Sequence, residues 1–196
     1  ICKTNLSSTV KNKIISLLLK ILIFSLFSFH SHSSEQNWKP AKEGNKIILI
    51  RHSLAPGGGD PVGFKIDDCR TQRNLNKVGI NQSKKIGKLF KKNKVPVDQV
   101  FSSQWCRCKD TAKYAFGNFK EFTALNSTFQ SPYNQNEGRQ LKELYSFVEQ
   151  WDGKGKNLVL ITHFSIITAL TNAVPSSGEI VITSKNFDII GTIATD

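Results

Sequence analysis

Apolar residues are concentrated in two short, continuous runs, KIILI at 46–50 and NLVLIT at 157–162. A run of this length without polar alternation is typical of a strand that is covered on both faces, as in a parallel sheet. Weaker patterns predict further strands, and the last two of them are expected to form a hairpin; these strands are 97–103, 122–125, 178–184 and 187–194.

Between the strands, apolar residues recur at helical spacing. The predicted helices are 76–93, 105–116, 139–151 and 165–174, with Gly117 and Pro175 as stops for the second and the last. Residues 35–45 are expected to be a polar lead-in, and 53–74 a long loop rich in Gly, Pro and Asp.

Strands that alternate with helices predict an α/β fold. We expect a three-layer α/β/α sandwich with a mostly parallel central sheet. In such sheets, binding sites form beyond the carboxyl ends of the strands. Loops at that edge are therefore the places to look for chemistry.

The first 34 residues differ from the rest of the chain. They contain four lysines and no acidic residue, then the apolar run ILIFSLFSF at 21–29 and the small residues SHSS at 31–34. This order predicts a secretory signal peptide over 1–34, cleaved near Ser33 or Ser34, and a folded domain over 35–196. The alternative is a membrane anchor, but a spanning helix needs about 20 apolar residues, and Lys20 interrupts this run. We expect an exported, periplasmic bacterial protein that meets a membrane only through an uncleaved leader.

The charge left after cleavage is positive. Residues 35–196 keep 23 of the 27 Lys and Arg residues against 15 Asp and Glu, a net charge of +8. That charge favours anionic partners, although the lysines of 81–94 also suit a solvated helix face. No known nucleic-acid-binding motif is present, so no nucleic-acid partner is expected.

Three cysteines remain in the domain, Cys69, Cys106 and Cys108. In an oxidising compartment, an odd number favours one disulfide and one buried thiol. Their spacing fits no usual zinc site. We expect no metal and no cofactor.

Only two histidines remain in the domain, since His30 and His32 leave with the leader. His52 follows the first apolar run in LIRH, and His163 follows the other in LITH. Both are therefore predicted at the edge of the sheet that carries binding sites.

Two arginines are predicted at the same edge. Arg51 precedes His52, and Arg107 lies in the first turn of the helix that begins in FSSQWCRCKDTA. A guanidinium can bind two phosphate oxygens, and a helix N-terminus attracts anions. One imidazole could attack phosphorus and the other could stabilise its oxygens. The alternative is that the arginines are surface charges and the histidines core residues.

These motifs resemble those of the histidine phosphatase superfamily, which has the phosphoglycerate mutase-like fold. RHS, SSQWCRCKDTA and ITHFSIITAL resemble its three site motifs, and NLNKVGINQS at 74–83 resembles a fourth segment. The matches cover 46–174 in the expected order. The resemblance implies a metal-free phosphatase in which His52 is the nucleophile, while Arg51, Arg107 and His163 form the phosphate pocket.

The chain departs from the family pattern at three places. Ser53 and Phe164 replace residues that are usually glycine, and Phe164 is expected to narrow the pocket mouth. The region after the third strand, 125–133, lacks the glutamate that many members use as the general acid. Asp60, on the loop after His52, is the first candidate for that role, ahead of Glu137 and Glu143. A turn-forming Asp before Pro explains Asp60 equally well.

The resemblance also bears on the long loop. The family's small residue beneath the helix corresponds to Cys108, so Cys106 would point outward and pair with Cys69; the alternative is Cys69–Cys108. The glycine run 57–59 lacks the ending of a nucleotide-binding loop and is expected to cover the pocket.

The function implied is hydrolysis of a phosphomonoester through a phosphohistidine, on a periplasmic sugar phosphate or an envelope-glycan phosphate. Two alternatives remain open. The protein could be a phosphoprotein or phosphohistidine phosphatase, or it could bind phosphorylated ligands without turnover.

Overall fold

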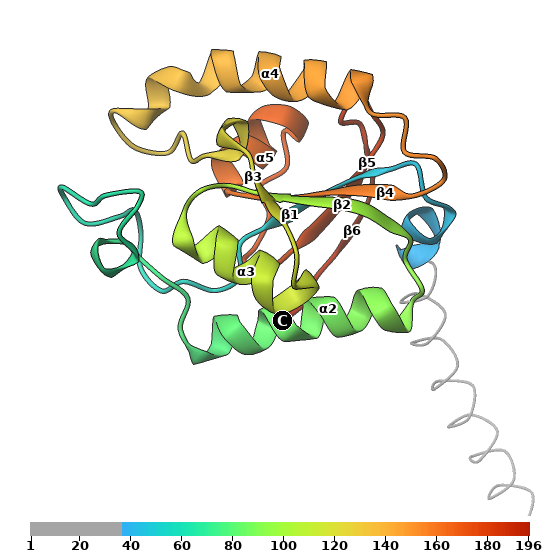
Figure 1. The fold of residues 1–196 in the computed structure, drawn as a ribbon, viewed down its shortest axis with the longest axis horizontal. Coiled ribbons are helices and arrows are strands. Elements are labelled where there is room, and N and C mark those ends of the chain that lie inside the picture. The colour runs from blue at the N-terminus through green and yellow to red at the C-terminus, as the bar shows by residue number, and fades with distance from the viewer. Residues whose placement is uncertain (1–36) are drawn as a thin grey trace, which may run out of the picture. The chain divides into compact units, whose positions relative to one another are not determined.

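A six-stranded sheet forms the centre of the computed structural model, which describes residues 37–196 (Figure 1). The strand order is β3-β2-β4-β1-β5-β6. The first four strands run parallel, whereas β5 is antiparallel to β1 and β6 to β5. The strands are β1 (Ile47–Arg51), β2 (Val97–Ser102), β3 (Lys120–Glu121), β4 (Asn157–Thr162), β5 (Ile180–Thr183) and β6 (Ile189–Ile193). The predicted mostly parallel sheet and its final hairpin are confirmed, while the predicted signal peptide lies outside the described residues.

Helices cover both faces of the sheet, as the continuous apolar strands predicted (Figure 1). Helices α2 (Lys77–Lys92) and α3 (Cys106–Phe116) pack on one face, and α4 (Glu137–Gln150) and α5 (Phe164–Thr171) on the other. Ile48 and Ile50 of β1 belong to the first core, and Ile47 and Leu49 to the second. β1 therefore has two buried faces, and the fold is the expected three-layer sandwich.

Two predicted segments differ from the structure. Residues 37–43 are helical rather than a polar lead-in, because the Trp38 ring is buried against Phe90. Residues Thr123–Leu125 form a 3₁₀ turn, η2, rather than a strand. The side chains of Gln140 and Thr162 donate to the carbonyls of Ala124 and Leu125, so these carbonyls need no strand partner.

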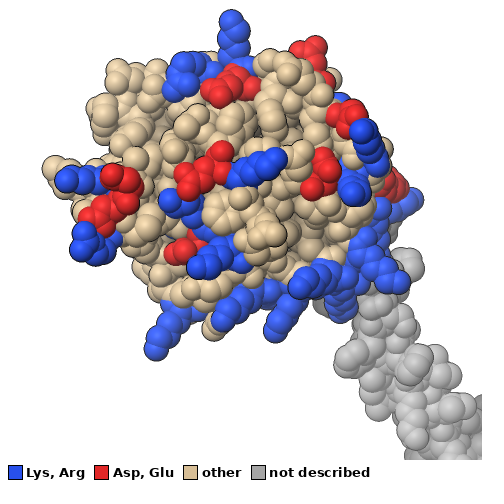
Figure 2. All heavy atoms as spheres, in the orientation of Figure 1, with Lys and Arg blue, Asp and Glu red and all other residues tan. Residues whose placement is uncertain are grey.

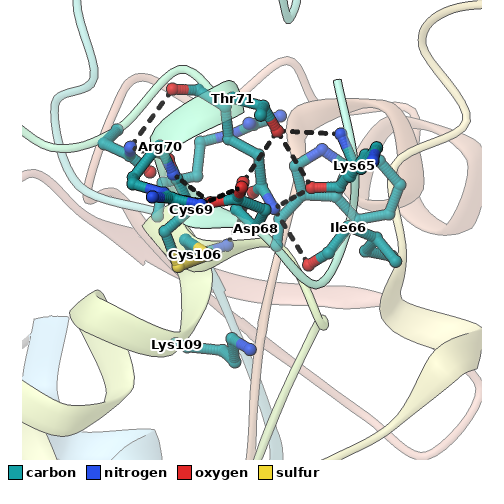
Figure 3. Close-up of a disulfide and its surroundings, with 12 residues drawn as sticks. Lys65, Ile66, Asp68, Cys69, Arg70, Thr71, Cys106 and Lys109 are labelled. Carbon is teal, nitrogen blue, oxygen red and sulfur yellow. Dashed lines mark hydrogen bonds and ion pairs between the residues drawn. A yellow bond between two sulfur atoms is a disulfide. The ribbon is translucent and has the colours of Figure 1, made fainter. Parts of the chain in front are cut away.

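The long loop between β1 and α2 is tied to the start of α3. A disulfide joins Cys69, in the 3₁₀ turn η1 (Cys69–Thr71), to Cys106, and Cys108 is a buried free thiol (Figure 3). The side-chain oxygen of Gln72 accepts a hydrogen bond from the Cys106 N–H at 2.9 Å. The pairing implied by the family resemblance is confirmed.

Removing this disulfide is expected to lower the free energy of unfolding. The bond spans 37 residues, and a closed loop of that length restricts the unfolded chain by roughly 3–4 kcal/mol. Replacing Cys69 and Cys106 together by serine should therefore shift the urea midpoint markedly downward. A reducing agent should lower the urea midpoint of the parent protein by a similar amount and leave the midpoint of the double variant unchanged. An unshifted midpoint would contradict a structural role for the bond.

Lysines gather along the exposed side of α2, at the lower edge of the molecule in Figure 2. The opposite side of this helix carries Ile86 and Phe90 into the core. The six lysines of the helix are all exposed: Lys77, Lys84, Lys85, Lys88, Lys91 and Lys92. Among residues 37–196, no helix has both the length and the apolar composition that crossing a bilayer requires.

Candidate active site

The two histidines lie side by side because the strands before them are paired in register. Arg51 of β1 is paired with Thr162 of β4, and each strand then ends, so His52 and His163 follow at the same level. Their ring centroids are 5.4 Å apart. Both side chains are buried. The expected meeting of the two imidazoles at the carboxyl edge of the sheet is confirmed.

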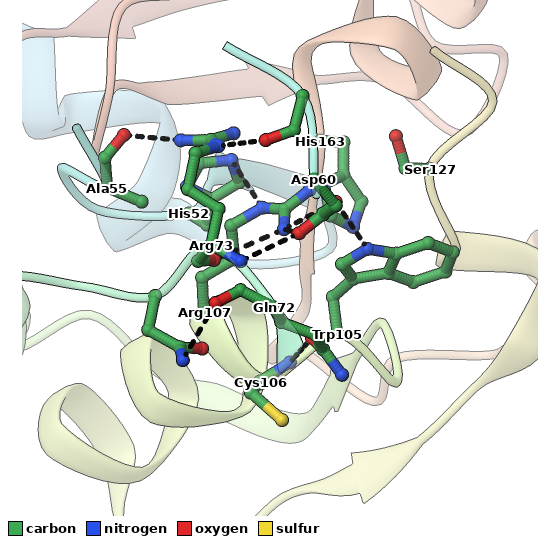
Figure 4. A network of polar contacts seen from close by, with 12 residues as sticks. His52, Ala55, Asp60, Gln72, Arg73, Trp105, Cys106, Arg107, Ser127 and His163 are labelled. Carbon is green, nitrogen blue, oxygen red and sulfur yellow. Dashed lines mark hydrogen bonds and ion pairs between the residues drawn. The ribbon is translucent and has the colours of Figure 1, made fainter. Parts of the chain in front are cut away.

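The guanidinium of Arg107 lies between the two rings (Figure 4). Its Nε donates to Nε2 of His52 at 3.2 Å, and its Nη2 lies 3.4 Å from Nδ1 of His163. Arg107 is buried in the first turn of α3. This helix begins shortly after β2 ends at the same edge of the sheet. The described structure thus brings the predicted Arg107 and both predicted histidines together.

The hydrogen bonds of His52 determine which ring nitrogen is free. Its Nδ1 lies 2.8 Å from the carbonyl oxygen of Ser53. A carbonyl only accepts, so Nδ1 carries the proton and Nε2 keeps its lone pair. Burial, and then the charge of Arg107, hold the pKa of His52 well below its usual 6.5. At neutral pH the ring is therefore uncharged, and its Nε2 carries a lone pair that faces Arg107 Nε–H.

His163 is held by polar groups beneath it. Its Nε2 lies 2.9 Å from Oγ of Ser103 and 3.4 Å from Sγ of Cys108. Burial, followed by the charge of Arg107, lowers the pKa of His163 well below 6.5. Burial also raises the pKa of the Cys108 thiol to about 12, so this sulfur is a thiol at neutral pH and not a nucleophile.

A small cavity of about 90 Å³ opens over these groups and is lined by both histidines, Arg107 and Arg51. Arg51 donates from Nη1 to the carbonyl of Pro175 at 2.7 Å, while its buried Nε has no hydrogen-bond partner among residues 37–196. A buried donor without a partner is costly, and an anion oxygen would satisfy it. Burial, then the charge of Arg107, lowers the pKa of Arg51, as expected for guanidinium groups gathered at one site.

Phe164 and Phe129 lie at the wall of this cavity, with ring centroids 5.1 Å apart. The guanidinium carbon of Arg51 lies 5.4 Å from the centre of the Phe164 ring. The glycine run 57–59 also lines the cavity, as expected. Ser53, which stands where the family usually has glycine, fits its surroundings. Its Oγ accepts from the hydroxyl of Ser83, and its backbone N–H donates to Oγ1 of Thr111.

Arg73 is a site residue that the sequence interpretation missed. It lines the cavity, and its Nε donates to the carbonyl of Gly59 at 2.8 Å while Nη1 donates to that of Ala55. Burial, and then repulsion from Arg107, lowers the pKa of Arg73. A signal was available, because Arg73 directly precedes the 74–83 segment that carries the family resemblance.

Asp60 is close to the site but behind Arg107. Its two carboxylate oxygens lie 2.8 and 3.0 Å from Nη1 of Arg107, and both side chains are only 3% exposed. The indole of Trp105 donates to it at 2.9 Å, as does the backbone N–H of Arg73. Its role as the general acid stays a prediction.

The other two acid candidates do not face the cavity. Glu137 accepts from the hydroxyl of Thr128 at 2.9 Å, and Glu143 forms an exposed ion pair with Arg139. Neither lines the cavity. In the part of the chain that the structure describes, no group of three or more His, Cys, Asp or Glu side chains could bind a metal ion.

No protein-family model matches this sequence, and no curated protein matches it significantly. Solved structures do match. The protein histidine phosphatase SixA complexed with tungstate is 14% identical, with a TM-score of 0.52 over 76% of this chain and 97% of the other. A putative alpha-ribazole-5'-P phosphatase from Escherichia coli is 14% identical, with a TM-score of 0.54 over 78% and 97%. Phosphoglycerate mutase from Thermus thermophilus is 16% identical, with a TM-score of 0.51 over 77% and 99%. At these identities the likeness establishes the fold, which is the phosphoglycerate mutase-like fold that the motifs predicted.

Proposed function

We propose that this protein is a phosphomonoester hydrolase that works through a phosphohistidine on His52. The observation that carries the proposal is the state of that side chain. Its Nε2 keeps a lone pair, since Nδ1 donates to Ser53, and the ring sits 5.4 Å from His163 beside a cavity lined by arginines. A neutral imidazole in such a place can act as a nucleophile toward phosphorus.

The charges around the cavity fit a dianion. Arg51, Arg73 and Arg107 bring three positive charges, and Asp60 compensates one of them. The two histidines are neutral because burial lowers the pKa of each. The remaining charge of about +2 matches a phosphomonoester, which carries nearly two negative charges at neutral pH.

The first step would transfer the phosphoryl group to the enzyme. Nε2 of His52 forms a bond to phosphorus while the bond to the leaving oxygen breaks, and the leaving oxygen takes a proton from a solvent water molecule. Arg107 and Arg51 donate to the equatorial oxygens, where negative charge accumulates. The proton on Nδ1 stays in place, and the Ser53 carbonyl stabilises the positive charge that the ring gains.

The second step would release phosphate. A water molecule attacks phosphorus and gives up a proton to the solvent, which replaces the proton taken in the first step; the phosphorus–nitrogen bond breaks, and its electron pair returns to Nε2. His52 is then neutral again and inorganic phosphate leaves. Neither step requires a redox change or an external electron carrier.

The substrate we propose is a periplasmic sugar phosphate or an envelope-glycan phosphate. The leader pattern of residues 1–34 and the Cys69–Cys106 disulfide support export. The likeness to SixA, a protein histidine phosphatase, favours phosphohistidine proteins as the second candidate substrate. The small cavity suits the phosphoryl group itself, so discrimination between these substrates would depend on the mouth around Phe129 and Phe164.

Hydrolysis of p-nitrophenyl phosphate in excess EDTA tests the proposal. We expect turnover that EDTA leaves unchanged and that inorganic phosphate inhibits. Adding phosphorylated sugars and a phosphohistidine peptide to the assay then separates the two candidate substrates by kcat/KM. Phosphate-competable binding without any hydrolysis would identify a binding protein instead.

A further inference from the structure

The carboxylate of Asp60 pairs with the guanidinium of Arg107, the side chain that faces both histidines. This carboxylate is 3% exposed and is absent from the wall of the cavity. The guanidinium of Arg107 contacts this carboxylate and is also directed to the two imidazoles (Figure 4). A group in this place can reach the substrate only through Arg107.

The guanidinium of Arg107 is divided between two tasks. Nη1 donates to both oxygens of Asp60, whereas Nε and Nη2 are directed to His52 and His163. Arg51 and Arg73 lie near enough to repel Arg107. Without a fixed carboxylate, this repulsion would favour other rotamers of a long, flexible side chain.

The carboxylate itself is fixed from two sides. The Trp105 indole donates to one oxygen at 2.9 Å, and the Arg73 N–H donates to the other at 2.9 Å. Trp105 is the N-cap residue of α3, the helix that carries Arg107. The backbone N–H of Asp60 donates to the side-chain oxygen of Gln130 at 2.8 Å. Each carboxylate oxygen thus accepts from Arg107 and from one further N–H, that of the Arg73 backbone or of the Trp105 indole.

We propose that Asp60 is a positioning residue, which orients Arg107 toward the phosphoryl oxygens, and not the general acid. The inference rests on the proposed phosphatase function. It assigns to Asp60 no contact with the substrate and no proton transfer. The leaving oxygen must take its proton from another donor, for which water is sufficient when the leaving group has a low pKa.

A series of aryl phosphates with leaving groups of different pKa separates the two roles. A general acid helps a poor leaving group most. Its removal should therefore hardly affect p-nitrophenyl phosphate, and the fall in kcat/KM should increase with the pKa of the leaving group. A positioning residue acts on the phosphoryl oxygens, so its removal should lower kcat/KM by the same factor for every member of the series. For Asp60→Asn we expect kcat/KM to fall by roughly 10- to 100-fold across the whole series, as for residues that orient a catalytic group.

Asp98→Asn is the control for loss of an indole acceptor, because exposed Asp98 accepts from the Trp151 indole at 3.0 Å and does not line the cavity. It should leave the series unchanged. Asp60→Glu keeps a carboxylate and should give a smaller but equally uniform loss, which also provides a reading if Asp60→Asn does not fold. A loss that grows with leaving-group pKa in either variant, or no loss in a folded Asp60→Asn, would overturn the inference. An inactive parent protein would instead reject the proposed phosphatase function.

Discussion

His52→Ala is expected to abolish turnover of every phosphomonoester, lowering kcat by about 10⁴-fold or more. The substitution removes the nitrogen that would bond to phosphorus. Cys108 cannot replace it, because burial raises the pKa of that thiol to about 12. The measurement is rapid quenching with a ³²P-labelled substrate. The parent protein should retain label that is labile in acid and stable in base, whereas His52→Ala should retain none.

His163→Ala is the informative control for this experiment. It removes the second imidazole of the cavity lining but keeps the nucleophile, so we expect labelling to continue at a rate lowered by about 10²- to 10³-fold. Label on His52→Ala at the parent level would place the phosphorylated residue elsewhere. Turnover by the parent protein without label on the parent or on His52→Ala would indicate direct attack by water.

The elements that could be predicted are those whose signal is local. Strands β1 and β4 have two buried faces, so each contains a continuous run of four apolar residues, which predicts both the strands and the parallel sheet. The register between them then brings together His52 and His163, which are far apart in the sequence. The position of a residue directly after a buried strand was thus sufficient to predict the main part of the site.

The contacts made by the long loop could not be predicted in the same way. Asp60 and Arg73 reach Arg107 only because the loop between β1 and α2 folds back on α3, and no periodic pattern records that path. A general acid was therefore sought by nearness to His52 along the chain, which identified Asp60 but not its partner. Propensity failed at 37–43 for a related reason, since the burial of Trp38 depends on Phe90, a residue of another helix.

Arg107→Met is expected to lower both catalysis and stability. It removes the donors that face the two histidines, which should cost about 10²- to 10³-fold in kcat/KM for p-nitrophenyl phosphate. It also leaves the buried carboxylate of Asp60 without its cation. Loss of one member of a buried ion pair costs about 3–5 kcal/mol, so the urea midpoint should fall clearly.

Two further variants separate the effects on catalysis and stability. Arg107→Met with Asp60→Asn removes the unpaired charge and should recover much of the stability but none of the activity, because the donors are still missing. Arg51→Met is the matched arginine variant, since Arg51 donates to the carbonyl of Pro175 rather than to a carboxylate. It should weaken phosphate binding with a smaller loss of stability than Arg107→Met. If the double variant unfolds at the same urea concentration as Arg107→Met alone, the unpaired Asp60 carboxylate is not the source of the destabilisation. The buried ion pair would then not contribute to stability as proposed.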